Sequence, residues 1–534
     1  MSNNIGHLLE ARVAAAPDKT FLFSEADGRS WTYAEFDRAV NRTANLLRSY
    51  GIGKGEVVSL LMPNSAEYLI AYFACWKMGA LAGPINSLLK NDEIAWVVNN
   101  SESKLILVGS DWSESVTLAT STPTILFDNV DDVTNGFGSH SPERGHPCPL
   151  DATASDDQGH HAAHAGGTAV AGNGACVPTE DDDAIIIYTS GTTGKPKGCL
   201  LTHGNLVANA RQITEWMGFD ASDRLLTMMP LFHMNAVSVT TMTALYAGGS
   251  TVVSPKFSAS RFWETIEKYK ITSFGSVATM LSILLERGLP ARHSPAGSPR
   301  SLRFVMCGSA PVPAELLRRF EEAFECLVIE GYGLSESTCR STFNPPNQNR
   351  RPGSCGQPIG NEMKIFDDED HEMADGELGE IVLRGENIFR AYYKNTEATE
   401  KAFTNGWFHT GDIGYRDAEG FFYIADRKSD MIIRGGENIY PREIDDLLYT
   451  HPAIAEAAVI GIPDELYGEE VAAFVVLREG STISEDDLVE FCRKHFAEFK
   501  CPKSVRFLDE IPKGPTGKLL KRELTKIYSK TIHP

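Results

Sequence analysis

The stretch AIIIYTSGTTGKPKG at residues 184–198 decides the fold of this chain. Its first five residues, Ala184–Tyr188, form an apolar run rich in β-branched side chains, which predicts a short buried strand. Glycine lets the following loop wrap closely around an anion, and hydroxyl and lysine groups can contact phosphate oxygens. We therefore predict a phosphate loop rather than a polar hairpin. It is formed by Thr189, Ser190, Gly191, Thr192, Thr193, Gly194 and Lys195.

Helices and strands alternate on both sides of this loop. Apolar residues at helical spacing predict helices over Tyr33–Tyr50 and Ser65–Met78, and short apolar runs predict strands over Val57–Met62 and Leu105–Val108. Such alternation is typical of an α/β fold in which helices cover a sheet. Further strands are predicted at Leu302–Met306, Cys326–Glu330 and Glu380–Leu383.

Length and composition divide the chain into a long body, an insertion and a small terminal unit. Its 534 residues exceed the size at which a single core stops growing. Asp131–Pro178 is rich in Gly, Ala, Ser, Asp, Pro and His, which predicts a flexible surface insertion whose histidines fit a solvated loop better than a metal site. Beyond Asp430 we predict a small α/β unit. Its elements are helices at Ile444–Thr450 and Glu485–Glu498 and strands at Ala457–Gly461 and Val471–Leu477.

Charge and cysteine usage narrow the class of protein. The formal net charge of -21 repels phosphate backbones and argues against a nucleic-acid partner. The ten cysteines are scattered, without C-x-x-C pairs or zinc-ligand spacing, as in a reduced intracellular protein. The N-terminus does not match a signal peptide, and no run of about 18 apolar residues is present to span a membrane. We expect a cytoplasmic protein without a membrane span that acts on small molecules; a homodimer is one possible oligomeric state.

Several later segments carry groups suited to a nucleotide. The small-residue turn Gly308–Pro311 follows a predicted strand, where a flat ring can approach the backbone. Glu330–Glu336 supplies an aromatic ring, a hydroxyl and a carboxylate, and carboxylates beside phosphates are natural Mg²⁺ ligands. Asp412 supplies a carboxylate that can accept hydrogen bonds from both ribose hydroxyls. From the residues alone, His233 beside Phe232 is more typical of a packed core histidine than of a catalyst.

In this order along the chain, the motifs resemble those of the adenylate-forming superfamily, which includes acyl-CoA synthetases, luciferases and nonribosomal adenylation domains. The resemblance extends from about residue 5 to about residue 525, apart from the insertion. It implies a large N-terminal adenylation domain of stacked sheets and helices at residues 1–427, with the insertion at about 131–178, and a small mobile C-terminal α/β domain at 428–534. It also implies an acyl-CoA ligase that uses Mg-ATP to form acyl-AMP and then transfers the acyl group to coenzyme A.

The resemblance also implies roles for individual residues. Those expected around the adenine are Glu330, Gly331, Tyr332 and a wall formed by Gly308, Ser309, Ala310 and Pro311. Those expected along the rest of ATP are Ser335 at the α-phosphate, Glu336 at Mg²⁺, and Asp412 and Arg427 at the ribose. Those expected in or near the C-terminal domain are Ser429 as the hinge, Gly435 and Gly436 beside the pantetheine arm, and Lys518 as the adenylation lysine. His233 and Gly333 are expected in the acyl pocket, where His233 gates access of the thiol.

The sequence constrains the identity of the substrate acid less than it constrains the reaction. Amino-acid-activating relatives carry Asp at the position of His233, so an α-amino acid is disfavoured; acetate-specific relatives carry Trp at the position of Gly333, so a longer acyl chain is expected. The likeness is greatest to carnitine/crotonobetaine-type and fatty-acid CoA ligases, on Pro84–Asn86, Thr410–Phe422 and Arg434–Asn438. An adenylation enzyme that loads a carrier protein, a luciferase-like oxygenase and a non-catalytic nucleotide sensor are the alternatives.

Lys518 provides the first test of these roles. We expect Lys518→Ala to abolish acyl-AMP formation, because the α-phosphate loses a cation that stabilises its developing charge. Thioester formation from supplied acyl-AMP should remain largely intact. The two half-reactions are measured separately, by pyrophosphate release and by acyl-CoA formation. Equal loss of both would contradict the assignment.

Overall fold

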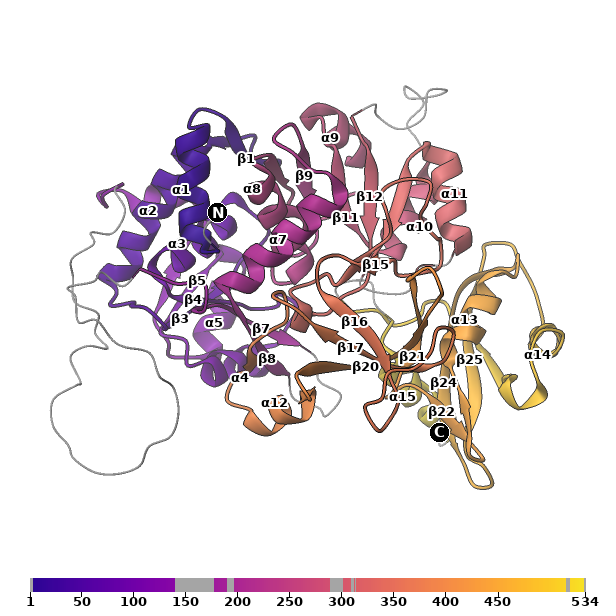
Figure 1. The fold of residues 1–534 in the computed structure, drawn as a ribbon. Helices are drawn as coiled ribbons and strands as arrows, with labels where there is room; N and C mark the ends of the chain where they lie inside the picture. The colour runs from indigo at the N-terminus through magenta and orange to yellow at the C-terminus, as the bar shows by residue number, and fades with distance from the viewer. Residues whose placement is uncertain are drawn as a thin grey trace, which may run out of the picture. The chain divides into compact units, whose positions relative to one another are not determined.

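The computed structural model describes residues 3–139, 177–189, 196–288, 301–308, 312, 314–514 and 519–532. The chain divides into one compact unit at residues 1–257 and 386–397 and a second at residues 258–385 and 398–534. Each unit combines helices with strands (Figure 1), which confirms the expected α/β class. The stretch predicted as an insertion begins inside helix α6 (Val130–Thr134), and most of it lies outside the described residues.

The first unit contains a seven-stranded sheet in the order β18-β8-β7-β4-β3-β5-β6. Strands β7, β4, β3, β5 and β6 are parallel to one another, whereas β8 and β18 are antiparallel to their neighbours. Their bounds are β3 (Val57–Leu61), β4 (Leu81–Pro84), β5 (Leu105–Val108), β6 (Thr124–Leu126), β7 (Asp183–Thr189), β8 (Lys197–Thr202) and β18 (Ala391–Tyr392). The strand predicted ahead of the phosphate loop is therefore present as β7.

A second group of strands in this unit lies across helix α3 (Ala66–Met78) from that sheet. Strands β9 (Arg224–Thr227), β10 (Ser250–Val253) and β1 (Thr20–Ser24) are parallel, and β2 (Ser30–Thr32) pairs antiparallel with β1. Helix α3 is buried on nearly all sides, as its largely apolar sequence requires. Its Trp76 Nε1 donates to the Ala184 carbonyl of β7 at 2.8 Å, and its Phe73 ring lies 6.4 Å from Phe21 of β1. The expected stacking of sheets and helices is thus confirmed.

The remaining helices of the first unit include the first one predicted from sequence. Helix α2 (Tyr33–Ser49) begins at a capping box in which the Thr32 and Glu35 side chains each accept from the other's backbone N–H. The others are α1 (Ile5–Ala15), α4 (Asn91–Ser101), α5 (Ser113–Ala119), α7 (His203–Met217) and α8 (Thr243–Ala247), with a 3₁₀ turn at Ser110–Trp112 and a π-helical segment at Asn235–Met242.

The second unit begins with three parallel strands and their helices. Strand β12 (Phe304–Cys307) pairs with β11 (Ser273–Ser276) on one side and with β13 (Leu327–Glu330) on the other. The β12–β13 register sets Cys307 opposite Glu330, so the segments that follow both strands start side by side. The helices are α9 (Phe262–Tyr269), α10 (Ala278–Arg287) and α11 (Ala314–Phe324).

An antiparallel sheet follows in the second unit, in the order β16-β17-β20-β19 with β21 paired to β20. Figure 1 shows β16, β17, β20 and β21 side by side. The bounds are β16 (Glu362–Phe366), β17 (Gly379–Arg384), β19 (Phe403–Thr404), β20 (Trp407–Arg416) and β21 (Phe422–Arg427). A two-stranded ribbon of β14 (Thr342–Phe343) and β15 (Gln357–Pro358), the 3₁₀ turn Ser335–Ser337 and helix α12 (Thr396–Ala402) complete this part of the chain.

Residues beyond Ser429 form a further sheet, β23-β22-β25-β24, with β26 paired to β25. The elements are β22 (Ile432–Arg434), β23 (Glu437–Ile439), α13 (Pro441–Tyr449), β24 (Ile454–Asp464), β25 (Gly468–Leu477), α14 (Glu485–Arg493), a 3₁₀ turn at Glu498–Lys500, β26 (Ser504–Phe507) and α15 (Lys521–Ile532). The prediction of a helix as far as Glu498 was wrong. Helix α14 ends at Arg493 because the chain turns to pack Phe496 against the core of this part.

That core comprises Ile444 and Leu448 of α13, Val459 of β24, Val471 of β25 and neighbouring apolar side chains. Among the residues that the structure describes, no helix is long and apolar enough to cross a membrane.

Leu448 tests the contribution of this core to stability. Its side chain is fully buried, so Leu448→Ala should destabilise this part of the chain by about 2–5 kcal/mol. Leu466, which is 78% exposed, supplies the control, and Leu466→Ala should change stability by less than about 0.5 kcal/mol. Urea unfolding followed by circular dichroism measures both. Equal shifts for the two variants would contradict the core assignment.

Candidate active site

The carboxylate of Asp412 brings together three residues predicted from sequence. Strands β20 and β21 pair so that Asp412 lies opposite Arg427. The Arg427 Nε lies 3.0 Å from Asp412 Oδ1, and the Tyr332 hydroxyl donates to Asp412 Oδ2 at 2.5 Å. The Asp412 side chain is 5% exposed, whereas Arg427 keeps 40% of its side chain exposed. A buried anion is therefore held by two donors, one of which also faces solvent.

Burial and charge set the pKa values of Tyr332 and Arg427 in this cluster. Burial and the adjacent Asp412 carboxylate raise the pKa of Tyr332 well above its usual value, so its hydroxyl remains a neutral donor. Burial lowers the pKa of Arg427, but Asp412 and other nearby negative groups, including Glu336, raise it by more. Arg427 therefore stays cationic, and Glu336 lies within the electrostatic reach of the same cluster.

The Thr410-Gly411-Asp412 motif sets the direction of the carboxylate. Thr410 Oγ1 accepts from the Asp412 backbone N–H at 3.0 Å and donates to the Ile381 carbonyl at 2.7 Å. Gly411 has φ of +73°, a left-handed conformation that glycine adopts without strain. The threonine and the glycine thus position the aspartate, although the sequence supported a role only for Asp412.

Close backbone packing explains the glycines of the 330–336 segment. A Cβ at Gly331 would lie 2.4 Å from the Phe343 ring, and one at Gly333 would lie 2.1 Å from the Cys339 carbonyl oxygen. Both contacts are too short for any other residue, so local packing by itself requires glycine at these positions. The assignment of Gly333 to the acyl pocket, and of acyl length to its small size, stays a prediction.

Gly308 ties the end of β12 to the same segment. A Cβ on Gly308 would lie 2.6 Å from the Gly331 carbonyl oxygen and 2.9 Å from Arg340 Nη2. The predicted adenine wall thus starts in direct contact with the segment that carries Tyr332. Ser309, Ala310 and Pro311 lie outside the described residues.

Glu330, Ser335 and Glu336 differ in their surroundings. Burial raises the pKa of Glu330 to about 8, and its Oε2 accepts from the Gly353 backbone N–H at 3.0 Å. The Glu330 side chain therefore supports the Gly353 turn, and its contact with adenine stays a prediction. Ser335 is half-buried in a 3₁₀ turn, and Glu336 next to it is 9% exposed.

The first unit holds the predicted phosphate loop and His233. Thr189 ends β7, with its Oγ1 3.5 Å from the Lys197 carbonyl oxygen, and Ser190 to Lys195 lie outside the described residues. Burial lowers the pKa of His233 to about 4, so its ring is neutral near pH 7. Its Nε2 is buried and has no hydrogen-bond partner within the part of the chain that the structure describes. The packed-histidine reading and the pocket reading both fit these facts.

The C-terminal site residues are placed only in part. Gly435 and Gly436, with φ of +61° and +92°, form the two-residue turn between β22 and β23. A Cβ at Gly436 would meet nothing within 4 Å, so the space beside it is open, and the passage of a pantetheine arm there stays a prediction. Lys518 lies outside the described residues, which resume at Leu519, opposite Lys513 in an antiparallel bridge.

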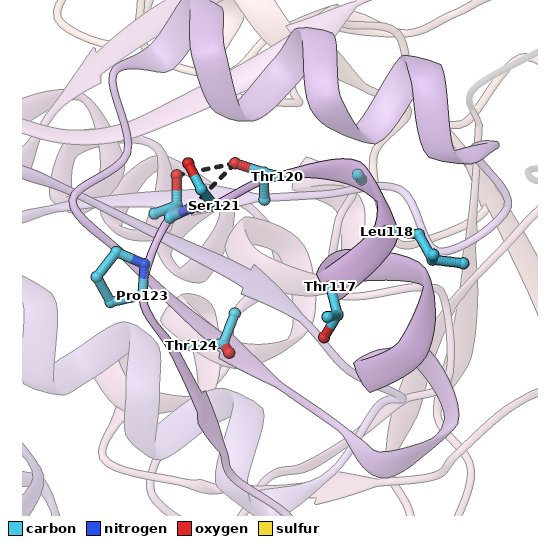
Figure 2. A pocket seen from close by; sticks show the side chains of 8 residues that line it. Thr117, Leu118, Thr120, Ser121, Pro123 and Thr124 are labelled. Atoms are coloured by element: carbon cyan, nitrogen blue, oxygen red, sulfur yellow. Dashed lines mark hydrogen bonds between the residues drawn. The ribbon is translucent and has the colours of Figure 1, made fainter.

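One hollow elsewhere lacks the groups that chemistry requires. It measures about 650 Å³ and is lined by the single segment 117–124. Figure 2 shows hydroxyl side chains such as Thr117, Thr120, Ser121 and Thr124 around it, and no titratable side chain lines it. In the described ranges, no group of three or more His, Cys, Asp or Glu side chains is arranged to hold a metal. The Asp412 cluster is therefore the better candidate.

Comparison with known proteins places these features in a family. A family model described as AMP-binding enzyme matches residues 9–393, and one described as AMP-binding enzyme C-terminal domain matches residues 443–518. Similar relatives include a sulfoacetate–CoA ligase of Cupriavidus necator, 36% identical over 98% of this chain and 97% of the relative. They also include the long-chain-fatty-acid–CoA ligase FadD13 of Mycobacterium tuberculosis, 35% identical over 99% of both chains. A crotonobetaine/carnitine–CoA ligase of Citrobacter koseri is 34% identical over 94% of this chain and 95% of its own.

Solved structures agree with these matches. ATP-bound MatB from Rhodopseudomonas palustris aligns with a TM-score of 0.86 and 28% identity, covering 99% of this chain and 100% of its own. MenE, an O-succinylbenzoate coenzyme A synthetase from Bacillus subtilis in complex with ATP and a magnesium ion, aligns with a TM-score of 0.81 and 31% identity. It covers 97% of this chain and 98% of its own.

The lowered pKa of His233 gives a pH-dependent prediction. Its folded pKa of about 4 lies below the ordinary 6.5, so the unfolded chain binds more protons between these values. Stability should therefore fall as the pH drops from 6.5 towards 4. His233→Gln removes this contribution, so the urea midpoint of the variant should fall less steeply over that range. Equal slopes in the variant and the wild type would contradict the prediction.

Proposed function

Because the chain belongs to the family of AMP-binding enzymes and is an ATP-dependent acid–thiol ligase, we propose that Tyr332, Asp412 and Arg427 hold the nucleoside end of its ATP. The acyl-CoA ligase activity expected from sequence, through an acyl-AMP, is confirmed by the family and by its named CoA-ligase relatives. ATP and coenzyme A are accordingly its co-substrates. The roles of the individual residues, the metal and the acid are the subject of the proposal.

The observation that carries the proposal is the doubly held Asp412 carboxylate. Tyr332 and Arg427 each contact one oxygen of this carboxylate, and the two donors fix its orientation. In the proposed function, the carboxylate oriented in this way accepts hydrogen bonds from the ribose hydroxyls. Arg427, at 40% exposure, is also accessible to a ligand. The Tyr332 ring, anchored through its hydroxyl, can offer a face to the purine.

Glu336 fits the role of a magnesium ligand. It is a carboxylate with 9% exposure, and its charge reaches Arg427 of the ribose cluster. Mg²⁺ in nucleotide sites is held by one or two carboxylates together with phosphate oxygens, so a three-carboxylate cluster is not required. Bound there, Mg²⁺ would neutralise charge on the phosphates. Ser335, in the same turn, is proposed at the α-phosphate.

Positioning and charge stabilisation then account for the first half-reaction. The substrate carboxylate attacks the α-phosphorus and pyrophosphate leaves. Lys518 and the loop from Thr189 to Lys195 are proposed to stabilise the negative charge that develops. In the second half-reaction the thiol of coenzyme A attacks the acyl carbonyl and AMP leaves. Gly435 and Gly436 are proposed to let the pantetheine arm pass, and neutral His233 to line the acyl pocket.

The relatives share this chemistry but act on different acids. Their names specify sulfoacetate, long-chain fatty acids and crotonobetaine or carnitine, so membership of the family does not fix the acid. For this chain we propose an acid larger than acetate and without an α-amino group. Transfer to a carrier protein and luciferase-like oxygenation are the alternatives; the CoA-ligase relatives favour free coenzyme A.

Pyrophosphate release across a panel of acids tests the proposed function. With purified protein, Mg-ATP and coenzyme A, hexanoate, aromatic acids, sulfoacetate or crotonobetaine should each be tested against acetate and an α-amino acid. At least one of the larger acids should exceed both acetate and the amino acid in kcat/KM. A clear preference for acetate, or no exchange of labelled pyrophosphate into ATP with any acid, would contradict the proposal.

The same assay isolates the nucleotide cluster. Asp412→Asn removes the charge that Arg427 faces, and we expect the KM for ATP to rise by about tenfold to a hundredfold, the range of a charge-assisted hydrogen bond. Asp375→Asn is the matched control, because Asp375 pairs with Arg416 at the surface of the same part of the chain. The control should keep the wild-type KM.

A further inference from the structure

Glu380 contacts both the predicted ribose motif and the predicted hinge. It lies on β17, next to β20, and its side chain is 15% exposed. Its Oε1 accepts from the Gly411 backbone N–H at 2.9 Å. Its Oε2 lies 3.5 Å from His409 Nδ1 and 3.7 Å from Lys428 Nζ. A single, largely buried carboxylate therefore has three partners, two on β20 and one directly after β21.

The contact with Gly411 affects the orientation of Asp412. Gly411 has positive φ, and its peptide N–H points to Glu380 while its carbonyl accepts from the Lys428 backbone N–H at 2.8 Å. Both sides of the residue before Asp412 are thus fixed. Without the Glu380 acceptor, the Gly411 N–H would lose its partner, and the adjacent carboxylate would lose its preorganised direction towards Tyr332 and Arg427.

The contact with Lys428 affects the start of the hinge. Lys428 follows Arg427 directly and precedes Ser429, and its ammonium lies 2.8 Å from Asp368 as well as 3.7 Å from Glu380. The two carboxylates raise the pKa of Lys428, so it stays charged. Asp368 is 83% exposed, whereas Glu380 is largely buried, so Glu380 is the more rigid of the two partners. The backbone bond of Lys428 to Gly411 and the contacts of its side chain with Asp368 and Glu380 together hold Lys428 against the sheet that carries Asp412.

We propose that Glu380 is a positioning residue that links the ribose-binding carboxylate to the root of the hinge. Through its contact with Gly411, Glu380 orients Asp412 for ATP. Through its contact with Lys428, Glu380 holds the last residue that stays with the sheet carrying Asp412 when the C-terminal part turns about Ser429. This inference rests on the proposed function. In this proposal Glu380 touches none of the substrates. It acts in acyl-AMP formation through Gly411 and in thioester formation through Lys428.

Two substitutions at one position separate the two links. Glu380→Gln keeps an oxygen that accepts from Gly411 but loses the charge that attracts Lys428. Glu380→Ala loses both. We expect the KM for ATP in acyl-AMP formation to be about tenfold higher in Glu380→Ala than in Glu380→Gln, as for loss of a buried hydrogen bond. We expect both variants to form thioester from supplied acyl-AMP about two- to fivefold more slowly than wild type, in the range of a partly exposed ion pair.

Lys428→Met and Glu372→Gln supply the comparisons. Lys428→Met should reproduce the slower thioester step without the large rise in KM for ATP, and its combination with Glu380→Gln should add nothing further. Glu372, which pairs with Lys364 and Arg416 on the same sheet, should tolerate Glu372→Gln with wild-type rates. Should Glu380→Ala fail to fold, the Glu380→Gln and Lys428→Met pair still decides the hinge link.

Equal KM values for ATP in the Ala and Gln variants would overturn the ribose link. A thioester step at the wild-type rate in Glu380→Gln and Lys428→Met would overturn the hinge link. An inactive wild-type protein would instead refute the proposed function, so the two failures are distinguishable.

Discussion

The carboxylate of Asp412 is the constraint on which the candidate site depends. An anion that is 5% exposed must be paired or it destabilises the fold. Arg427 reaches it across the β20–β21 pair, and Tyr332 reaches it from the segment after β13. The position of this one charge therefore depends on both the β20–β21 register and the path of the segment after β13. In the proposed function, this oriented carboxylate accepts hydrogen bonds from the ribose hydroxyls.

Close packing of backbones is the second physical requirement. Gly308, Gly331 and Gly333 each lie against a carbonyl oxygen, a ring or a guanidinium at distances that no Cβ could occupy. These glycines bring the ends of β12 and β13 together and so carry Tyr332 towards Asp412. A small residue in a nucleotide motif therefore has two explanations, space for a ligand and space for the protein's own backbone. At Gly333 the second is sufficient.

Local charge, rather than overall charge, is what the proposed function uses to attract the nucleotide. A chain with a formal net charge of -21 repels ATP at long range, so attraction must come from cations held in place by acids. Arg427 beside Asp412 follows this pattern, because the carboxylate keeps the guanidinium charged and fixes where it points. A related nucleotide site can then serve relatives that act on acids as different as sulfoacetate and long-chain fatty acids.

The sequence by itself determined the α/β class, the family and its chemistry, and the strand β7 that precedes the predicted phosphate loop. These follow from local patterns, such as apolar periodicity and motifs of adjacent residues. The sequence also singled out Asp412, Arg427 and Tyr332, but as separate motifs, with Tyr332 80 residues before Asp412. Only the tertiary structure decided that they meet at one carboxylate, because strand register and backbone packing bring distant segments together. It likewise decided that Glu330 supports a turn, that helix α14 ends at Arg493, and that Glu380 contacts Gly411 and Lys428. Such contacts depend on which residues lie opposite each other across strands, and no local pattern records that.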